Sequence, residues 1–232
     1  MELSPKILEN KIDFVPLLEG VEPDVLPNIF LVIKGLKPAT EVIIKEKDQA
    51  RIVKESLTQL GLQVVGQEWS GQYVFGVSLD RNKAEEVLRI LPGMAEQRGK
   101  IHTELDRRYG ELMGFPKSAI EAFMTREVIP LPVEDRILES YGLRNNIFNY
   151  RLSRDHFKEE LSQTASWYRA ILDQAPELIS LLFPEPEKAK DFRSGVEKFI
   201  LNFPENQVQL PTNAAEIMEM ARLDRETRRG MD

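Results

Sequence analysis

The sequence predicts an α+β protein, and three observations lead to this class. Hydrophobic residues make up 42% of the chain and charged residues 30%, which is close to ordinary globular composition. Residues 28–93 mix the two-residue period of strands with the 3.6-residue period of helices, whereas residues 94–232 are helix-periodic almost throughout. We therefore expect an N-terminal ββαββα sandwich of ferredoxin-like character, followed by a C-terminal helical bundle.

Three segments follow from these patterns. Residues 1–27 contain four prolines and short apolar clusters without a sustained period, so we expect an extended arm packed on the body. Residues 28–93 form the sandwich, and Pro92 and Gly93 are expected to end its last helix. Residues 94–232 form the helical module, in which we find no internal repeat.

Four strands are expected in the sandwich. Apolar runs at residues 28–34 and 41–46 are separated by a connection that contains glycine and proline, which predicts a strand pair. Residues 62–69 and 72–79 flank the dipeptide Ser-Gly and predict a hairpin.

Two amphipathic helices complete the sandwich. Asp48 and Asp80 are suitable N-caps, and apolar residues follow each of them at helical spacing. Gly61 stands where a glycine is expected after a helix C-terminus. We expect both helices to cover the same face of a small antiparallel or mixed sheet.

The helical module is predicted to be a series of amphipathic helices. Proline begins or interrupts several of them, as it prefers to do in a first helical turn. The helices are expected at residues 94–113, 116–126, 133–141, 154–175, 176–183, 185–203 and 213–229.

Composition excludes several kinds of chemistry. The chain contains no cysteine, so disulfides, thiolate nucleophiles, iron–sulfur clusters and thiolate zinc sites are all excluded. The glycines form no phosphate-cradling loop, and we predict no cofactor. The formal net charge of −7 is spread along the chain, with −3 in residues 1–93 and −4 in the remainder, which disfavours nucleic acid as a partner.

The hydropathy pattern also bears on location. The longest apolar run covers residues 29–33, far fewer than the roughly 20 residues of a membrane-spanning helix. The N-terminal residues lack the apolar core of a signal peptide. We expect a cytoplasmic protein that does not enter a membrane.

Residues 107–123, which read RRYGELMGFPKSAIEAF, resemble the signature of an uncharacterised, largely archaeal family of prokaryotic proteins. In that family a helix ends in a Leu-Gly-Tyr-Pro-like turn, which a cysteine pair and a short helix follow. Residues 113–116 match the turn, whereas Ser118 and Ala119 stand where the cysteines of the Leu-Gly-Tyr-Pro-x-Cys-Cys-like signature would be. The resemblance implies a diverged, cysteine-less member of the family.

Residues 149–178 resemble a second part of the same family, in which a Pro-Cys-Ser-like turn and another cysteine precede a long helix. The turn lies at residues 151–157 in this chain, and the cysteines are again missing. If the family's cysteines bind a metal or act as thiols, the resemblance implies that this chain has lost that chemistry.

The first matching turn supplies four candidates for a functional surface, Gly114, Phe115, Pro116 and Ser118. Gly114 suits a helix C-terminus with positive φ, and Pro116 suits the first turn of the next helix. The same pattern is also typical of a helix–turn–helix junction without any function.

Asp155 and His156 are candidates at the start of a predicted helix, with Glu159 and Glu160 one turn further on. A His and a Glu three or four residues apart on a helix can bind a metal. Acidic residues at a helix N-terminus are equally favoured by the helix dipole, and we predict no metal site.

Three arginines, Arg222, Arg225 and Arg229, lie at near-helical spacing in the last predicted helix. A basic final turn complements the helix dipole. The alternative interpretation is a tail that binds a protein partner or an acidic ligand.

Two functions of different classes are carried forward. The first is a soluble binding or protein-interaction protein, because recognition requires shaped apolar and charged surface but no special residue type. The second is an enzyme that works through carboxylates, with or without a divalent cation, for which Glu104, Glu111, Glu121 and Glu160 are candidates. Two of these carboxylates in one concave pocket would favour the enzyme, and their dispersal over solvated faces would contradict it.

A third hypothesis concerns assembly. A sandwich of this fold class can pair an edge strand with that of a second copy, so a homo-oligomer is a candidate assembly beside a protein partner.

Overall fold

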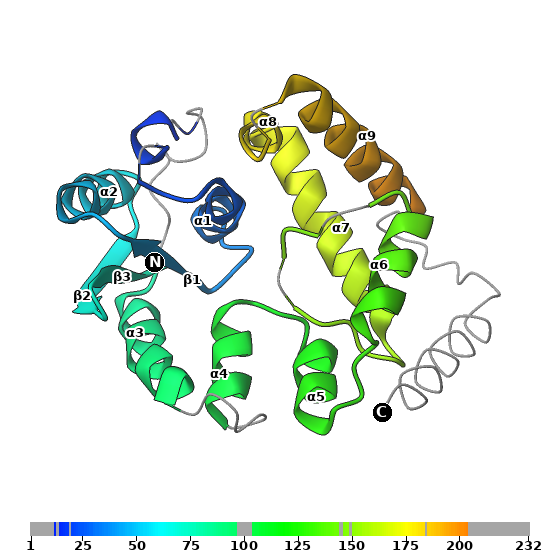
Figure 1. The fold of residues 1–232 in the computed structure, drawn as a ribbon, viewed down its shortest axis with the longest axis horizontal. Coiled ribbons are helices and arrows are strands. Elements are labelled where there is room, and N and C mark those ends of the chain that lie inside the picture. The colour runs from blue at the N-terminus through cyan, green and yellow to red at the C-terminus, as the bar shows by residue number, and fades with distance from the viewer. Residues whose placement is uncertain are drawn as a thin grey trace, which may run out of the picture. The chain divides into compact units, whose positions relative to one another are not determined.

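The structure, a computed structural model, describes residues 12, 14–18, 20–96, 104–143, 146–148, 150–183 and 185–203. Contacts divide the chain into two compact units. The first consists of Met1–Arg98, Leu112–Gly114 and Ala170–Leu182, and the second of Gly99–Glu111, Phe115–Arg169 and Phe183–Asp232. Figure 1 labels the helices and strands of both units.

The first unit is built on a small antiparallel sheet. Within the described residues its strands are β1 (Ala39–Ile44), β2 (Gln63–Trp69) and β3 (Gln72–Ser78), in the order β1-β3-β2. Its helices are η2 (Val15–Leu17), η3 (Pro23–Val25), α1 (Leu26–Ile33), α2 (Lys47–Gln59), α3 (Arg81–Glu96) and α8 (Glu177–Leu181). The predicted hairpin, a strand near residues 41–46 and the two helices near Asp48 and Asp80 are confirmed. Helix α2 begins at Lys47, so Asp48 lies in its first turn and the expectation that it is the N-cap is wrong. Asp80 does cap its helix, because its Oδ1 accepts a hydrogen bond from the N–H of Asn82.

The first predicted strand, at residues 28–34, is wrong, because this segment lies in helix α1. Seven of the eight residues of α1 are buried, so the run is apolar on all sides and has no helical or strand period to read. A short buried run of this kind cannot be assigned by periodicity, and Pro27 in its first turn favours the helix. The element order is therefore αβαββα rather than ββαββα, and the described residues do not supply the fourth strand of a ferredoxin-like sheet.

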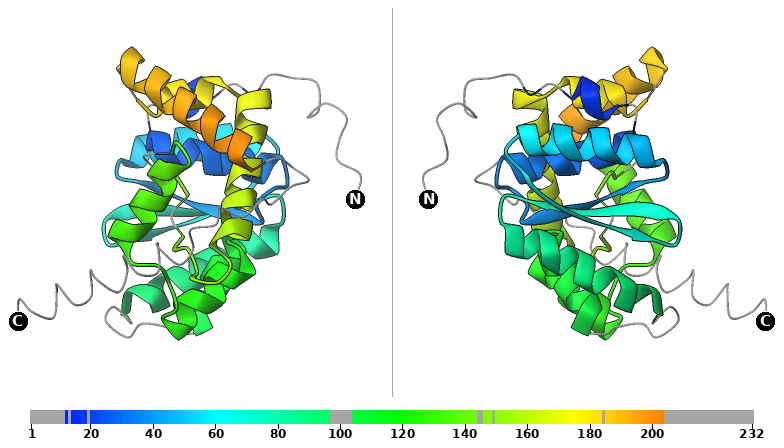
Figure 2. Two further views of the ribbon diagram at one scale, coloured as in Figure 1. Left: turned by 90° about the vertical axis from the view of Figure 1, so that its right-hand side faces the viewer. Right: turned by 90° about the vertical axis from the view of Figure 1, so that its left-hand side faces the viewer.

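The helices of the first unit cover both faces of the sheet, so the expectation of a single covered face is also wrong. Figure 2 shows α1 and α2 on one side of the strands and α3 on the other. On β3, Phe75 and Val77 point to one face and Val74 and Gly76 to the other, and all four are buried. A strand that is apolar at successive positions is typical of a sheet covered on both faces.

Glycine allows two close approaches in this sheet. A side chain at Gly76 would meet the carbonyl oxygen of Ala84, where α3 lies against β3. On the opposite face, the ring of Phe75 occupies the space that a side chain at Gly66 would need. Gly66 lies opposite Phe75 in the β2–β3 register, so the ring lies over the edge strand.

Two boundaries differ from the sequence-based expectation. Helix α3 continues past Pro92 and Gly93 to Glu96. The segment predicted as an extended arm contains the turns η2 and η3 where it is described, and its side chains Phe14, Leu17 and Val21 are buried.

The second unit is helical, as the sequence predicts. In the described residues it contains α4 (Glu104–Leu112) without its last residue, α5 (Lys117–Thr125), α6 (Leu131–Ser140), α7 (Phe157–Gln174) up to residue 169, and α9 (Pro186–Asn202). Its core includes an aromatic cluster in which Tyr168 contacts Phe148, Phe192 and Phe199, with ring centroids 5.1–6.2 Å apart. The predicted helix at residues 213–229 lies outside the described residues, and the bundle arrangement stays a prediction.

None of the helices in the described residues combines the length and the hydropathy that a membrane-spanning segment requires.

A buried lysine lies in the turn between α1 and β1. The side chain of Lys37 is 5% exposed, and its Nζ donates a hydrogen bond to Oδ1 of Asn28 at 2.6 Å. Burial disfavours the charged ammonium and lowers the pKa of Lys37 from 10.5 to about 7.

This lysine predicts a stability that rises with pH. Below about pH 7 both the folded and the unfolded protein carry the ammonium, so the folded state bears the cost of burying a charge. Between pH 7 and 10 only the unfolded chain holds this proton, so the free energy of unfolding rises with pH. From pH 6 to 9.5, the parent's free energy of unfolding should rise by roughly 3 kcal/mol more than that of Lys37→Met. Urea unfolding at both pH values measures the difference, with the exposed Lys54→Met on α2 as control. Equal pH profiles for the parent and Lys37→Met would contradict the prediction.

Candidate functional site

A cavity of about 530 Å³ lies in the second unit, beside helix α9. This volume is within the range of small-molecule sites. Nine residues line it: Glu139, Gly142, Phe183, Lys188, Asp191, Phe192, Ser194, Gly195 and Lys198. They come from the end of α6, the turn that follows it, the residue Phe183 and one side of α9.

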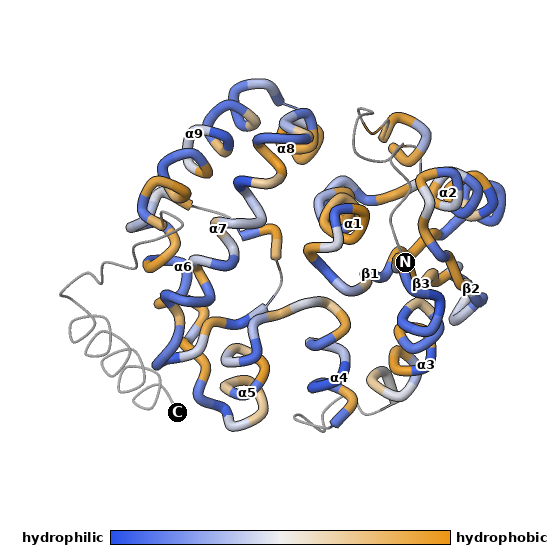
Figure 3. Tube along the Cα trace, turned by 180° about the vertical axis from the view of Figure 1, so that it is seen from behind, coloured by the Kyte–Doolittle hydropathy of each residue, from blue (hydrophilic) through white to orange (hydrophobic). Residues whose placement is uncertain are grey.

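Helix α9 contributes most of the lining because its residues repeat at helical spacing. Lys188, Asp191, Gly195 and Lys198 follow one another at intervals of three or four residues and therefore share a face, and Phe192 stands four residues after Lys188 and three before Gly195 at the edge of that face. Phe192 is 7% exposed, whereas the three charged residues are exposed. Figure 3 shows the resulting mixture of hydrophilic and hydrophobic residues along α9. The helix thus presents one buried ring and a charged rim to the cavity.

Two glycines bring α9 close to the turn after α6. Gly142 has φ +95°, and the N–H of the following Leu143 donates to the carbonyl oxygen of Leu138 at 2.8 Å, which closes the end of α6. A Cβ at Gly195 would lie 2.5 Å from the carbonyl oxygen of Gly142. A Cβ at Gly142 would lie 3.0 Å from Cβ of Lys198. Any larger residue at either position would push the two segments apart, and both glycines leave bare backbone in the cavity.

An apolar wall is formed by two phenylalanines. The rings of Phe183 and Phe192 are 5.0 Å apart between centroids and are inclined by 49°. Phe192 also contacts the fully buried Tyr168 of α7, with centroids 6.2 Å apart. The wall is therefore continuous with the aromatic core of the unit.

The charges at the rim are only partly neutralised. Nζ of Lys188 forms an ion pair with Oε1 of Glu185 at 3.0 Å. Glu139, Asp191 and Lys198 form no side-chain ion pair with any residue that the structure describes. Within the described residues, two carboxylates and one ammonium of the lining thus have no ion-pair partner.

The candidates from the family-like turn lie elsewhere. Gly114 belongs to the first unit and has φ +70°, and a Cβ there would lie 2.8 Å from Cδ of Pro38. In the second unit the ring of Phe115 contacts Tyr150, with centroids 5.5 Å apart, and Pro116 precedes the first residue of α5. The expected positive φ and helix start are confirmed, and none of the three residues lines the cavity.

Ser118 takes part in a buried hydrogen-bond network around Glu160. The hydroxyl of Ser118 donates to Oε1 of Glu160 at 2.6 Å, and the N–H of Ser153 donates to Oε2 at 2.8 Å. The hydroxyl of Tyr150 donates to the carbonyl oxygen of Glu160 at 2.7 Å and lies 2.6 Å from Oγ1 of Thr164. Glu160 is 0% exposed, so its carboxylate joins α5, α7 and the segment at Ser153 rather than facing a ligand.

A second buried carboxylate stabilises the same segment. Oε2 of Glu134 accepts a hydrogen bond from Nε of Arg151 at 3.1 Å, and Arg151 also donates to the carbonyl oxygen of Ile129. Burial raises the pKa of Glu134, and the hydrogen bond from Arg151 opposes that shift. Val128 and Ser153 form an isolated antiparallel bridge beside this pair. These two carboxylates therefore hold the loop between α6 and α7.

Asp155 and His156 lie on the surface just before α7, and both are exposed. The N–H of His156 donates to Oγ of Ser153 at 3.0 Å, which ends the buried network at the start of the helix. The described part of the chain contains no group of three His, Asp or Glu side chains arranged for a metal ion. Arg222, Arg225 and Arg229 lie outside the described residues.

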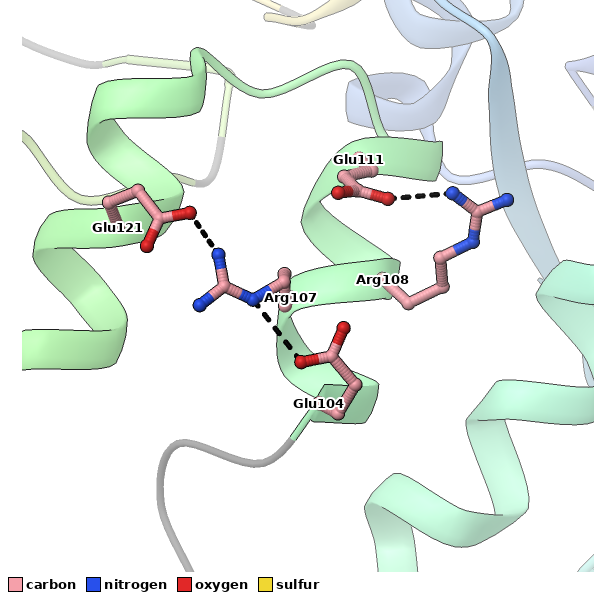
Figure 4. A network of polar contacts seen from close by, with 5 residues as sticks. All are labelled: Glu104, Arg107, Arg108, Glu111 and Glu121. Carbon is pink, nitrogen blue, oxygen red and sulfur yellow. Dashed lines mark hydrogen bonds and ion pairs between the residues drawn. The ribbon is translucent and has the colours of Figure 1, made fainter.

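The other three candidate carboxylates form surface ion pairs. In Figure 4, Arg107 of α4 lies between Glu104 and Glu121, and Arg108 pairs with Glu111. The side chain of Glu104 is 82% exposed and that of Glu121 44% exposed, so these pairs contribute little to stability. Glu104 and Glu121 thus share one arginine, and none of the four carboxylates singled out from the sequence lines the cavity.

Sequence reasoning did not select the residues that line the cavity. One available signal was Gly195, an isolated glycine within a predicted helix. Glycine costs about 1 kcal/mol relative to alanine in a helix interior, so its presence there indicates a close packing contact. Glu139, Asp191 and Lys198 carried no such signal, because charged residues on an amphipathic helix are ordinarily solvated.

Comparison with protein-family models, with curated proteins and with solved structures gives no match for this chain. Membership of the largely archaeal family therefore stays a prediction from the two stretches that resemble it.

The buried network predicts that Glu160 is a structural residue. Glu160→Ala leaves the N–H of Ser153 and the hydroxyl of Ser118 without their acceptor and opens a small void, so it should destabilise the fold by about 2–4 kcal/mol. Its exposed neighbour provides a matched control, since Glu159→Ala should change stability by less than about 0.5 kcal/mol. Urea unfolding of both variants tests this. Equal stability of the two would revive Glu160 as a catalytic candidate.

The glycine contact predicts an unusual sign for a second substitution. A glycine-to-alanine change inside a helix normally stabilises it by up to about 1 kcal/mol. Gly195→Ala should instead destabilise the protein by roughly 1–2 kcal/mol, because the new methyl group meets the backbone of Gly142. Thermal unfolding should show a lower Tm for Gly195→Ala and an unchanged or higher Tm for the adjacent Ser194→Ala. A stabilised Gly195→Ala would show that the two segments are not in contact.

Proposed function

We propose that this protein is a binding protein that holds a small ligand in the cavity beside α9. One observation carries the proposal: an apolar wall and unneutralised charges of both signs meet in a cavity of about 530 Å³. Small-molecule sites combine such a volume with an apolar lining and a few polar groups that orient the ligand. The proposal requires no cysteine, haem or iron–sulfur chemistry.

The packing behind the cavity supports binding. Phe192 is anchored against Tyr168, whose hydroxyl accepts a hydrogen bond from the N–H of Ile147 at 3.2 Å. Gly142 and Gly195 hold the opposite wall at backbone contact. A site whose walls are already packed loses little conformational entropy when a ligand enters, which favours affinity.

A carboxylate-dependent enzyme is the second candidate. Glu139 and Asp191 line the same cavity, and two carboxylates in one concave site can serve as acid and base if their environments separate their pKa values. Mass spectrometry of a bound compound before and after incubation distinguishes the two candidates, because a binding protein releases it unchanged.

From the sequence we further propose a cytoplasmic location and a protein partner or a homo-oligomer. Sedimentation velocity at several protein concentrations tests the oligomer, since self-association shifts the sedimentation coefficient with concentration.

Indole is a suitable probe of the cavity, because it is a flat apolar ring with one polar N–H. In ¹H–¹⁵N correlation spectra, millimolar indole should shift the amide signals of residues 139–143 and 183–198 selectively. Ser194→Trp, which fills the cavity from its rim, should abolish these shifts, and the exposed Arg193→Trp beside it should preserve them. Shifts spread over the whole protein, or identical behaviour of the two variants, would contradict a binding site here.

A further inference from the structure

We propose that this chain forms a symmetric dimer in which the edge strand β2 pairs antiparallel with β2 of a second copy, with Gly66 at the two-fold axis. The inference rests on the homo-oligomer proposed above, specifies its surface and does not depend on the cavity beside α9. It follows from the exposure of β2, the direction of its backbone groups and the order of its side chains.

Strand β2 is an accessible edge of the sheet. Within the residues that the structure describes it pairs with β3 alone, and Figure 1 shows it at the margin of the sheet. None of its seven residues is buried, and Gly66, Gln67 and Glu68 are exposed in succession. The other edge strand, β1, has four buried residues among its six. A further strand is therefore expected at β2 rather than at β1.

The backbone groups that β2 turns away from β3 follow from the hairpin register. The turn at residues 70–71 has positive φ at both positions, so the residues that flank it, Trp69 and Gln72, are a hydrogen-bonded pair. Hydrogen-bonded and non-hydrogen-bonded pairs alternate along an antiparallel ladder. The N–H and C=O groups that point away from β3 are therefore those of Val64, Gly66 and Glu68.

Strand β2 lacks the features that ordinarily protect an edge. Edge strands are commonly blunted by lysine, proline or a bulge. The seven residues of β2, QVVGQEW, include neither lysine nor proline, and they pair with β3 in unbroken register. Their one charged residue is Glu68. A regular and weakly charged edge of this kind is a template for another strand.

The order of residues in β2 suits a second copy of the same strand. Gly66 is the central residue of β2, so antiparallel pairing about it pairs all seven residues. This register places Val64 opposite Glu68 of the second copy, so the outward backbone groups of one copy meet those of the other. The only charge of the strand thus meets an apolar residue and not its own like charge, which would be destabilising. The same residues take part from both copies, as a two-fold interface requires.

A charge swap at residues 64 and 68 tests the register. Val64→Glu places like charges opposite each other twice per dimer and Val64→Lys places opposite charges there, so Val64→Lys should dimerise roughly ten-fold more tightly. In the Glu68→Lys background the order should reverse. Residues 64 and 68 of one chain are about 13 Å apart along the strand, beyond the Debye length of about 8 Å, so the reversal requires contact between copies. Sedimentation equilibrium measures the dimer dissociation constants.

Lys54→Glu is the control, because Lys54 is exposed on α2 and its replacement should leave the dimer unchanged. A parent that dimerises while the two variants keep the same order in both backgrounds would overturn the β2 interface and leave the homo-oligomer standing. A parent that stays monomeric at every concentration would overturn both. Neither result bears on the ligand cavity, which the indole experiment tests.

A disulfide provides an independent test, because the chain contains no cysteine of its own. In the proposed register Val65 and Gln67 of the two copies form a non-hydrogen-bonded pair with Cα atoms about 4.5 Å apart, which a disulfide can bridge. A mixture of Val65→Cys and Gln67→Cys should therefore cross-link on oxidation. Gln67→Cys alone should cross-link far less, because its two copies are offset along the strands, and a mixture of Gln67→Cys with Lys54→Cys is the control. Equal cross-linking in the three samples would overturn the proposal.

Discussion

The buried carboxylate of Glu160 is the constraint on which the second unit depends. A charged group without solvent exposure costs several kcal/mol unless hydrogen-bond donors surround it. Those donors are the hydroxyl of Ser118 on α5 and the N–H of Ser153 in the segment before α7, so the charge on one helix specifies the position of two other elements. Tyr150 and Thr164, which are both buried, complete the network. Once α7 is held in this way, Trp167 and Tyr168 can support the aromatic core against which α9 packs.

The second constraint is the contact between two glycines. Backbone meets backbone where Gly195 of α9 faces Gly142 after α6, and a Cβ at either position would make a close contact with the other segment. The exposed charges of α9 line the same cavity as Glu139. The cavity is thus lined by two glycines, Gly142 and Gly195, and by the rings of Phe183 and Phe192. Its charged rim adds little to stability, since Glu139, Asp191 and Lys198 form no ion pair within the described residues.

The two units differ in what stabilises them. In the first unit both faces of a narrow sheet are covered by helices, and Phe75, Val77 and Val74 on the central strand are all buried. Its buried polar residues among those described include Lys37, Thr40 and Ser78. Lys37 donates a hydrogen bond to Asn28, and its burial lowers the pKa of the ammonium. In the second unit, buried carboxylates and aromatic rings share the core. Two of the candidate residues that came from the family-like turns serve this core: Phe115 contacts Tyr150, and Ser118 binds Glu160.

The sequence by itself determined the α+β class, the hairpin of β2 and β3, the helices α2 and α3, and the helical character of residues 104–203 where described. These features follow from turn residues and hydrophobic period, which are local signals. It could not distinguish a helix from a strand at residues 28–34, since a segment buried on all sides has no polar face to set a period. Only the tertiary structure decided which carboxylates are buried. Glu160 and Glu159 are adjacent and chemically alike, yet one is enclosed and the other is solvated, because packing partners far along the chain select between them. The cavity is a tertiary feature for the same reason: Glu139 and Lys198, far apart in the sequence, line one cavity where Gly142 and Gly195 let their segments touch.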